Sequence, residues 1–384
     1  MLNFSYVNPV KVVFGKGQIS RLRELIPMNA KILITYGGGS IKKNGVYTQV
    51  KDALAGHHWL EFGGIEPNPK YETCMQVVEM VKREKIDFLL SVGGGSVLDG
   101  TKFIAAAAKY EGGEPWDILE KGAEVKDAVK IGCVMTLPAT GSESNSLAVI
   151  SRNSTQQKLA YYSEKSFPQF CILDPETTMS LSERQVANGI VDTFVHVSEQ
   201  YMTYPVNTPL QDRMAEGIYL TLIEETPKVK ADPMNYEVRA NLMWCATWGL
   251  NGWIAQGCVQ DWLTHMIGHE ITALTGTDHG RTLALVLPAV WSYLRESKKE
   301  KLLQYAQRIW GITGNDSNQV IDEAISRTKA FFRQAGITAT KAEYGVTDEV
   351  CRKIAEIAET RNPRWGERQN ITGKDVLAIL DLCD

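Results

Sequence analysis

The chain of 384 residues is 44% hydrophobic and 22% charged, with a formal net charge of −4, and its length corresponds to about two domains of roughly 100–200 residues. The small negative charge and an isoelectric point near 6.0 argue against a nucleic-acid partner or an anionic membrane surface. No segment approaches the roughly 20 consecutive apolar residues that span a bilayer, so no membrane association is expected.

The chain begins with Met1-Leu2-Asn3-Phe4-Ser5-Tyr6, which lacks the basic and apolar regions of a signal peptide. Its seven cysteines are scattered and form no C-x-x-C pair. An odd number of cysteines without a spacing pattern is typical of reduced thiols. We therefore expect a cytoplasmic protein.

Short apolar runs alternate with helical patterns through the first half of the chain. Strands are predicted at residues 11–14, 31–36, 59–62, 86–92 and 131–136, and helices at 19–25, 46–54 and 97–109. A hairpin is predicted next, with strands at residues 148–151 and 159–162. Strands that alternate with helices predict an α/β domain with a parallel, Rossmann-like sheet. We assign residues 1–180 to this nucleotide-binding domain.

Glycine-rich segments follow two of these strands, at the points where an open parallel sheet binds ligands. They are Gly37-Gly38-Gly39-Ser40 and Gly93-Gly94-Gly95-Ser96, and the second opens a helix. Glycine lets the backbone approach a phosphate group, and a helix N-terminus attracts its negative charge. One glycine triplet alone is more typical of a tight turn, and neither segment is a G-x-G-x-x-G motif. Two triplets after two strands favour a nucleotide site.

The turn after the second strand bears on the choice of cofactor. An acidic residue there would hydrogen-bond a ribose 2′-hydroxyl and repel a 2′-phosphate, but this turn offers only glycine and Ser40. Lys42, Lys43 and Lys158 can supply positive charge, although Lys42 and Lys43 are more typical of solvated surface charges. These features favour NADP(H). The remaining predicted cofactor contacts are Asp99, Thr136, Thr140 and Asn145.

From residue 181 onward almost every segment has a helical pattern. Ser182-Glu183-Arg184-Gln185 is a capping-box sequence, which predicts the start of a long helix that ends before Pro205. Further helices are predicted at residues 209–224, 236–255, 261–274, 283–295, 301–310, 318–335, 348–359 and 374–382. We assign residues 181–384 to an all-helical, metal-binding domain.

Four of the six histidines lie between residues 192 and 279. Asp192 and His196 are four residues apart, as are His265 and His269, so each pair projects from one face of a helix. One such pair alone is more typical of an ordinary helix surface, but two pairs together with His279 indicate a site for a divalent metal such as Fe²⁺ or Zn²⁺. With Asp192, His196, His265 and His279 as ligands, His269 is left beside the metal to handle protons.

A metalloprotease helix is an alternative interpretation of His265-x-x-x-His269. That motif requires glutamate directly after the first histidine as general base, and this position holds Met266. Four tryptophans lie between the two halves of the metal set, namely Trp244, Trp248, Trp253 and Trp262. Core packing is their commoner role, and an apolar wall beside the metal is the alternative.

These motifs together resemble the metal-dependent, iron-containing (group III) alcohol dehydrogenases, and within them the bacterial NADPH-dependent aldehyde reductases and butanol dehydrogenases. The resemblance rests on motifs that span most of the chain in order: Phe14-Gly15-Lys16-Gly17, Tyr36-Gly37-Gly38-Gly39-Ser40, Gly93-Gly94-Gly95-Ser96-Val97-Leu98-Asp99, Thr140-Gly141-Ser142-Glu143, Asp192-x-x-x-His196 and His265-x-x-x-His269-x9-His279-Gly280.

The resemblance implies a dehydroquinate synthase-like architecture, with a nucleotide-binding domain, a helical domain and a metal in the cleft between them. It implies that Asp192, His196, His265 and His279 coordinate the metal, with His269 close by. It also implies a homodimer. Gly39 stands where NAD-using relatives have an aspartate, which supports NADP.

The expected reaction is therefore the metal-assisted interconversion of small aldehydes and primary alcohols with NADP(H). His269, or water together with a ribose hydroxyl, would relay the proton. A glycerol or glycerol-phosphate dehydrogenase and a dehydroquinate synthase-like lyase are alternatives, but a phosphorylated or carboxylated substrate needs clustered basic residues, and residues 240–280 have only Arg239 and Arg281 at their edges. The other alternative is a non-catalytic protein that binds nucleotide and metal.

Overall fold

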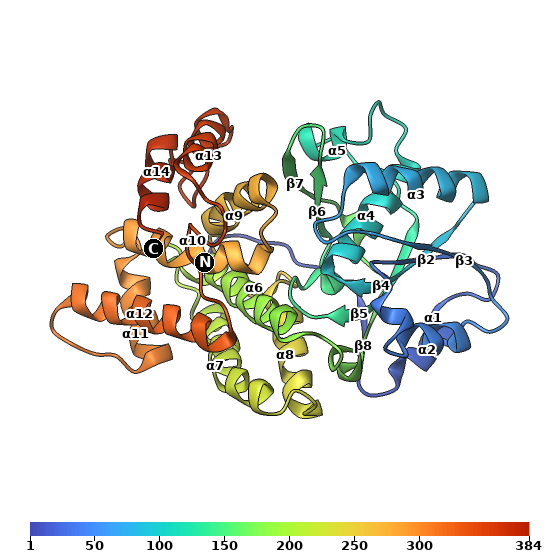
Figure 1. Ribbon diagram of the computed structural model, residues 1–384, viewed down its shortest axis with the longest axis horizontal. Helices are drawn as coiled ribbons and strands as arrows, with labels where there is room; N and C mark the ends of the chain where they lie inside the picture. Colours follow the sequence, from blue (N-terminus) through green and yellow to red (C-terminus); the bar gives the residue numbers. More distant parts are fainter. Residues whose placement is uncertain (384) are drawn as a thin grey trace. The chain divides into compact units, whose positions relative to one another are not determined.

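The computed structural model describes residues 1–383, whose contacts divide the chain into two compact units (Figure 1). The sheet unit comprises Val7–Leu181 and Met234–Thr247, and the helical unit comprises Met1–Tyr6, Ser182–Pro233 and the residues from Trp248 onward. The prediction has a single break between residues 180 and 181. The contacts instead place the first six residues in the helical unit and the segment 234–247 in the sheet unit. That predicted domain boundary stays a prediction.

Six parallel strands form the sheet, in the order β1-β8-β5-β4-β2-β3. They are β1 (Lys11–Phe14), β2 (Lys31–Tyr36), β3 (His58–Gly63), β4 (Phe88–Gly94), β5 (Lys130–Leu137) and β8 (Phe170–Leu173). The order places β2, β4 and β5 side by side, so the segments that follow them meet at one edge of the sheet. The predicted parallel sheet is confirmed.

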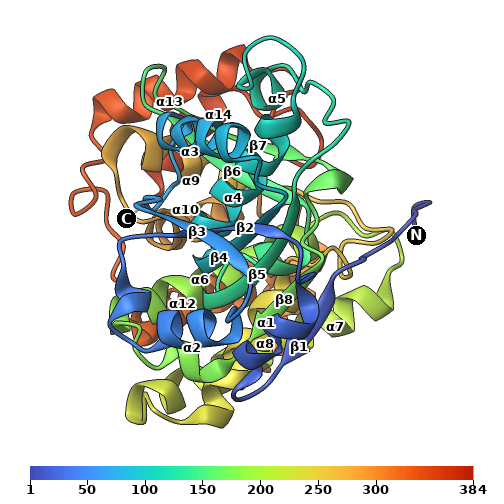
Figure 2. The same cartoon turned by 90° about the vertical axis from the view of Figure 1, so that its right-hand side faces the viewer.

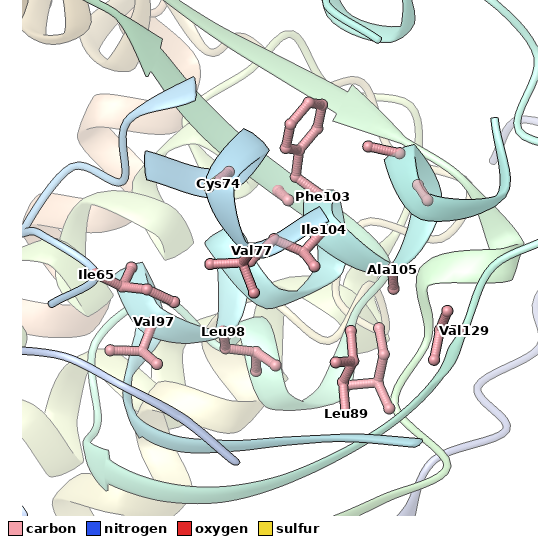
Figure 3. Packing of buried hydrophobic residues seen from close by; sticks show 14 of the residues in the cluster. Ile65, Cys74, Val77, Leu89, Val97, Leu98, Phe103, Ile104, Ala105 and Val129 are labelled. Carbon is pink, nitrogen blue, oxygen red and sulfur yellow. The ribbon is translucent and has the colours of Figure 1, made fainter. Parts of the chain in front are cut away.

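Alternate side chains of the central strands enter two separate apolar cores, as the period-2 geometry of a strand requires. Leu89 and Cys133 belong to the core that also contains residues of α3 (Tyr71–Glu84) and α4 (Gly95–Lys109) (Figure 3). Leu90 and Val134, their chain neighbours, enter the opposite core, with residues of α1 (Leu22–Leu25) and α2 (Val46–Ala53). Figure 2 shows α3 above and α2 below strands β2 and β3. Helices therefore cover both faces of the sheet.

The sheet unit also contains a hairpin, short helical turns and helix α8. The predicted hairpin is confirmed as β6 (Leu147–Arg152) and β7 (Gln157–Tyr162), which pair antiparallel. The short helix α5 covers Asp117–Glu120, and short 3₁₀ turns cover Gln18–Arg21, Ser40–Lys42, Ser142–Ser144, Glu164–Ser166 and Pro175–Thr178. Helix α8 (Tyr236–Gly249) stops six residues before the predicted end at 255, because a turn with Gly252 at φ 87° follows it.

The helical unit consists of α6 (Glu183–Tyr201), α7 (Pro209–Ala231), α9 (Leu263–Thr275), α10 (His279–Tyr293), α11 (Lys299–Trp310), α12 (Ser317–Ala335), α13 (Asp348–Thr360) and α14 (Gly373–Asp381). The predicted capping box at the start of α6 is present, since Ser182 accepts from the amide of Gln185 and Gln185 reaches back to Ser182. Helix α7 continues past Pro227 beyond its predicted end at 224. None of the described helices combines the length and apolarity that crossing a membrane requires.

Candidate metal and cofactor sites

Helix α6 brings two of the predicted metal ligands onto one buried face. Its sequence places Asn188, Asp192, His196 and Glu199 at spacings of four, four and three residues, which are neighbours along one side of a helix. The side chains of Asp192 and His196 are 6% and 7% exposed. A carboxylate and an imidazole buried this deeply need a compensating partner.

Three imidazole nitrogens converge on a single oxygen, Oδ1 of Asp192. Nδ1 of His196 lies 3.6 Å from it, Nε2 of His265 lies 3.8 Å from it, and Nε2 of His279 lies 3.9 Å from it. One ligand atom each from Asp192, His265 and His279 lies within 4.8 Å of the others, and His196 adjoins this group through Asp192. The structure thus brings all four sequence-predicted ligands together from α6, α9 and α10.

These separations fit a metal ion better than direct hydrogen bonds. Donor and acceptor atoms in a hydrogen bond lie about 2.7–3.2 Å apart, whereas tetrahedral bonds of about 2.0–2.2 Å to a metal separate neighbouring ligand atoms by roughly 3.3–3.6 Å. Among the described residues, the buried Nε2 of His265 has no hydrogen-bond partner. The donor set of one carboxylate and three imidazoles suits Fe²⁺ or Zn²⁺, so the residues fit the predicted ion.

His265 is fixed by Glu199, a residue that the sequence analysis did not single out. Oε1 of Glu199 accepts a hydrogen bond from the backbone N–H of His265 (2.8 Å) and lies within hydrogen-bond distance of its Nδ1 (3.0 Å). Burial favours the neutral imidazole, but the nearby carboxylates of Asp192 and Glu199 outweigh it and raise the pKa of His265 above its usual range. Burial raises the pKa of Glu199 as well.

His279 is fixed by contacts of its chain neighbours with α6. Oδ2 of Asp278 accepts hydrogen bonds from Arg184 (2.7 Å) and Asn188 (2.8 Å), and α10 begins at the next residue. Burial alone would raise the pKa of Asp278, but these hydrogen bonds lower it below its usual range. Gly280 lies so close to α6 that a Cβ atom there would be 2.6 Å from the carbonyl oxygen of Asn188. Only glycine permits this approach.

His269 and Trp262 complete the surroundings of the ligand group. The ring centroid of His269 lies 4.8 Å from that of His279 and 6.1 Å from that of His265. His269 therefore lies beside the predicted ligands, and its catalytic role stays a prediction.

Of the four tryptophans considered as an apolar wall, Trp262 lies against predicted ligands, with its ring 5.2 Å from His265 and 6.2 Å from His196. Trp253 instead packs against Tyr6 with its ring 5.3 Å away, and Trp244 belongs to the sheet unit, where it packs against Phe14. The role of Trp262 as a wall beside a substrate stays a prediction.

In the sheet unit, the two predicted glycine segments and Thr140 lie close together. A Cβ atom on Gly95 would be 2.3 Å from Oγ1 of Thr140, and one on Gly37 would be 3.5 Å from Val97 at the start of α4. Gly38 and Gly39 have nothing within 4 Å of their Cβ positions, and Gly39 has φ 89°. The segments after β2, β4 and β5 thus form a glycine-lined edge with open backbone at Gly38 and Gly39, which fits a bound phosphate group.

Two predicted cofactor residues, Asp99 and Asn145, lie in a buried network around Lys102. The ammonium group of Lys102 donates to Asn145 (3.0 Å) and to Ser142, and Asp99 accepts from Ser142 (2.7 Å) and from the amide of Val149 (3.0 Å). Burial lowers the pKa of Lys102 to about 8, against the attraction of Asp99, and burial raises the pKa of Asp99. These hydrogen bonds fix the position of the segment that follows Thr140. Direct cofactor contacts by Asp99 and Asn145 stay a prediction.

The predicted basic residues have different surroundings. Lys158 is 6% exposed, and its ammonium group donates to Asn68 (2.9 Å), whose backbone N–H donates to Ser96. This links Lys158 to the glycine segment at the start of α4. Lys42 pairs with Glu61 at 2.7 Å and lies over the rings of Tyr36 and Tyr47, so its charge is already partly neutralised.

The two parts of one known protein family match successive segments of the chain. Residues 9–175 match iron-containing alcohol dehydrogenase, and residues 186–382 match the C-terminal part of the Fe-containing alcohol dehydrogenase family. The chain therefore belongs to the iron-containing alcohol dehydrogenase family, which makes it an oxidoreductase and confirms the predicted resemblance.

Curated relatives and solved structures agree with this assignment. The chain is 55% identical to the NADPH-dependent aldehyde reductase YqhD of Escherichia coli strain K12 over 375 residues, or 97% of both chains. It is 40% identical to the probable NADH-dependent butanol dehydrogenase 1 of Bacillus subtilis, over 99% of both chains. The crystal structure of E. coli YqhD has a TM-score of 0.96 at 53% identity, over 100% of this chain and 99% of that chain.

A second solved structure is also similar over its whole length. The crystal structure of NADH-dependent butanol dehydrogenase A from Thermotoga maritima has a TM-score of 0.95 at 35% identity, over 100% of this chain and 99% of that chain. The predicted fold class is confirmed.

The close approach of Gly280 to α6 can be tested by substitution. We expect Gly280→Ala to weaken metal binding at least tenfold, because the methyl group meets the backbone of Asn188 and displaces the neighbouring His279. Titration of the metal-free protein with Zn²⁺ against a chromophoric chelator measures this. Gly217→Ala in α7 is the matched control, since nothing lies within 4 Å of that position. Equal zinc affinity in both variants would contradict the role given to this contact.

Proposed function

We propose that the protein is an NADPH-dependent reductase of small aldehydes, which also works in reverse as a primary-alcohol dehydrogenase and requires one divalent metal ion. The observation that carries the proposal is the convergence of three imidazoles on Oδ1 of Asp192. The 55% identity to a relative named NADPH-dependent aldehyde reductase supports the substrate class and the cofactor. Membership of the alcohol dehydrogenase family favours this reaction over a lyase or a non-catalytic binding role.

In this proposal Asp192, His196, His265 and His279 hold the metal, Fe²⁺ or Zn²⁺, inside the helical unit. A divalent ion bound there supplies Lewis acidity, which polarises a carbonyl oxygen and stabilises negative charge that develops on it. Asp192 contributes the negative charge of the donor set, and the three imidazoles are neutral donors. The burial of Asp192, His196 and His265 keeps competing water away from these donors.

The sheet unit holds NADP(H) in this proposal, and the cofactor supplies or accepts a hydride when bound. The backbone amides of Gly37–Ser40 and Gly93–Ser96, with Thr140, would bind its phosphate groups. Thr136, Asp99, Asn145 and Lys158 remain the other proposed contacts. Ser40 and the open positions at Gly38 and Gly39 leave room for a 2′-phosphate. The carboxylate of Glu61 pairs with Lys42, which reduces its repulsion of such a phosphate. The proposal requires the two units to act on one substrate molecule.

Reduction of an aldehyde adds a hydride to carbon and a proton to oxygen, so the protein needs a proton donor. His269 lies beside His279 without belonging to the proposed ligand set. Its imidazole nitrogen can hold a proton and pass it on, either directly or through water and a ribose hydroxyl. We assign His269 this role.

Cofactor oxidation measures the proposed activity. The purified protein with NADPH and butanal should lose absorbance at the reduced nicotinamide band, and a chelator should abolish this loss by removing the metal. Re-addition of Zn²⁺ or Fe²⁺ should restore the rate. NADPH should give a larger kcat/KM than NADH. No consumption with a series of linear and aromatic aldehydes would reject the proposed function.

The roles of the two histidines in α9 can be separated. We expect His269→Ala to lower kcat by about 10²–10⁴, the usual range for loss of a positioned proton donor, with metal content unchanged. His265→Ala should lose the metal itself, because it removes a donor. Metal analysis by atomic emission beside steady-state kinetics distinguishes the two. An equal loss of metal in both variants would contradict the assignment of His269.

A homodimer and a cytoplasmic location are finer parts of the proposal. Strand β1 lies at an edge of the sheet, and the rings of Phe14 and Trp244, 5.7 Å apart in the sheet unit, are 40% and 41% exposed. An open strand edge beside exposed aromatic side chains favours association with a second copy. The described residues form no disulfide, which is the state that a reducing compartment maintains.

Light scattering behind size-exclusion chromatography tests the dimer. The chain has a mass of 42.7 kDa, so a dimer has twice that mass. We expect Trp244→Glu to weaken the dimer by placing charge on the apolar surface, and Trp253→Glu, at a comparably exposed tryptophan of the helical unit, serves as the control. A wild-type mass near that of one chain at micromolar concentration would reject this part of the proposal.

A further inference from the structure

We infer that Glu199 is a positioning residue for the metal, which fixes both the placement and the tautomer of the ligand His265. The inference rests on the proposed function, because it concerns the same metal. Glu199 is 2% exposed and lies seven residues after Asp192 on α6, so one helix carries two proposed ligands and the residue that holds a third. Nothing in the ligand spacing itself reveals this residue, because Glu199 is not a donor to the metal.

The backbone of His265 lies in the first turn of α9. His265 is the third residue of this helix, and its backbone N–H is one of the amides that no intrahelical carbonyl can satisfy. The N-cap residue is Trp262, which has φ 65° and gives no side-chain cap. Glu199, which belongs to α6, supplies the missing hydrogen-bond acceptor. Its Oε1 lies 2.8 Å from the amide nitrogen of His265. A carboxylate there also interacts favourably with the helix dipole.

The imidazole of His265 also contacts Glu199. Oε1 of Glu199 accepts the backbone N–H and lies 3.0 Å from Nδ1 of His265, so the ionised carboxylate, which has no proton to donate, accepts from Nδ1 as well. Nδ1 therefore carries the proton, and Nε2 keeps the lone pair that a metal requires. Nε2 is the atom that faces Oδ1 of Asp192. One carboxylate oxygen thus sets the position of the backbone, the orientation of the ring and the tautomer.

Glu199 is itself held in place by its surroundings. Its backbone carbonyl accepts from the amide of Asp261 (2.9 Å), at the start of the segment that leads into α9. The carboxylate of Asp261 pairs at 2.9 Å with Lys298, whose side chain is completely buried. Lys298 also pairs with Glu367 at 3.3 Å. The connection between α6 and the start of α9 is therefore anchored twice, which leaves Glu199 little freedom to move.

The experiment compares Glu199→Ala and Glu199→Gln with the wild-type protein, all loaded with Zn²⁺. Removal of the acceptor in Glu199→Ala should weaken zinc binding about 10–100-fold, the usual effect of losing a residue that orients a metal ligand. Glutamine keeps an acceptor oxygen and should lose clearly less. Glu216→Ala is the control, since this glutamate is 5% exposed, pairs with Arg308 at 2.9 Å and contacts none of the proposed ligands.

A second readout follows the tautomer directly. In zinc-loaded protein labelled with ¹⁵N-histidine, six histidines give a tractable spectrum, and His265 should show a slowly exchanging Nδ1–H proton that persists in Glu199→Gln and disappears in Glu199→Ala. Chelator resistance of Glu199→Ala equal to the wild type, or of Glu199→Gln as poor as that of Glu199→Ala, would overturn the inference. A wild-type protein that binds no zinc would instead overturn the proposed function.

Discussion

The register of helix α6 is the constraint on which the proposed metal site depends. Because a helix repeats about every 3.6 residues, Asn188, Asp192, His196 and Glu199 lie along one side of it. Asp192 and His196 are proposed ligands, Glu199 binds the ligand on α9, and Asn188 binds the residue that precedes the ligand on α10. An insertion of one residue within this segment would turn the residues before it and after it to different faces of the helix. The four side chains would then no longer lie on one side.

This arrangement explains why charged groups can be buried in the helical unit. The side chains of Asp192 and His265 are both 6% exposed, and a carboxylate removed from water is costly unless it gains a strong partner. Imidazoles surround Oδ1 of Asp192 at distances longer than hydrogen bonds. A divalent cation among them would offset the cost of burial, and Glu199 satisfies the outer nitrogen of His265.

Much of this site was predictable from residue spacing. The pairs Asp192/His196 and His265/His269 lie on helices as their four-residue spacing requires, and the glycine segments after β2 and β4 meet because those strands are neighbours. Glu199, Asp278 and Lys102 were not predicted, because each acts through a contact distant in the sequence. The seven-residue interval from Asp192 places Glu199 on the same side of α6, but that interval alone does not show that Glu199 contacts His265. The early end of α8 was not predicted, because its apolar pattern continues beyond Gly249 although the turn with Gly252 ends the helix.

Crystals of the protein grown with its metal give the most direct test of the central claim. Anomalous scattering measured at the absorption edge of the bound metal, Fe or Zn, should show one strong peak per chain, bonded to Asp192, His196, His265 and His279 at about 2.0–2.2 Å. A peak held by other residues, or the absence of a peak among these four in metal-replete and catalytically active crystals, would contradict the account.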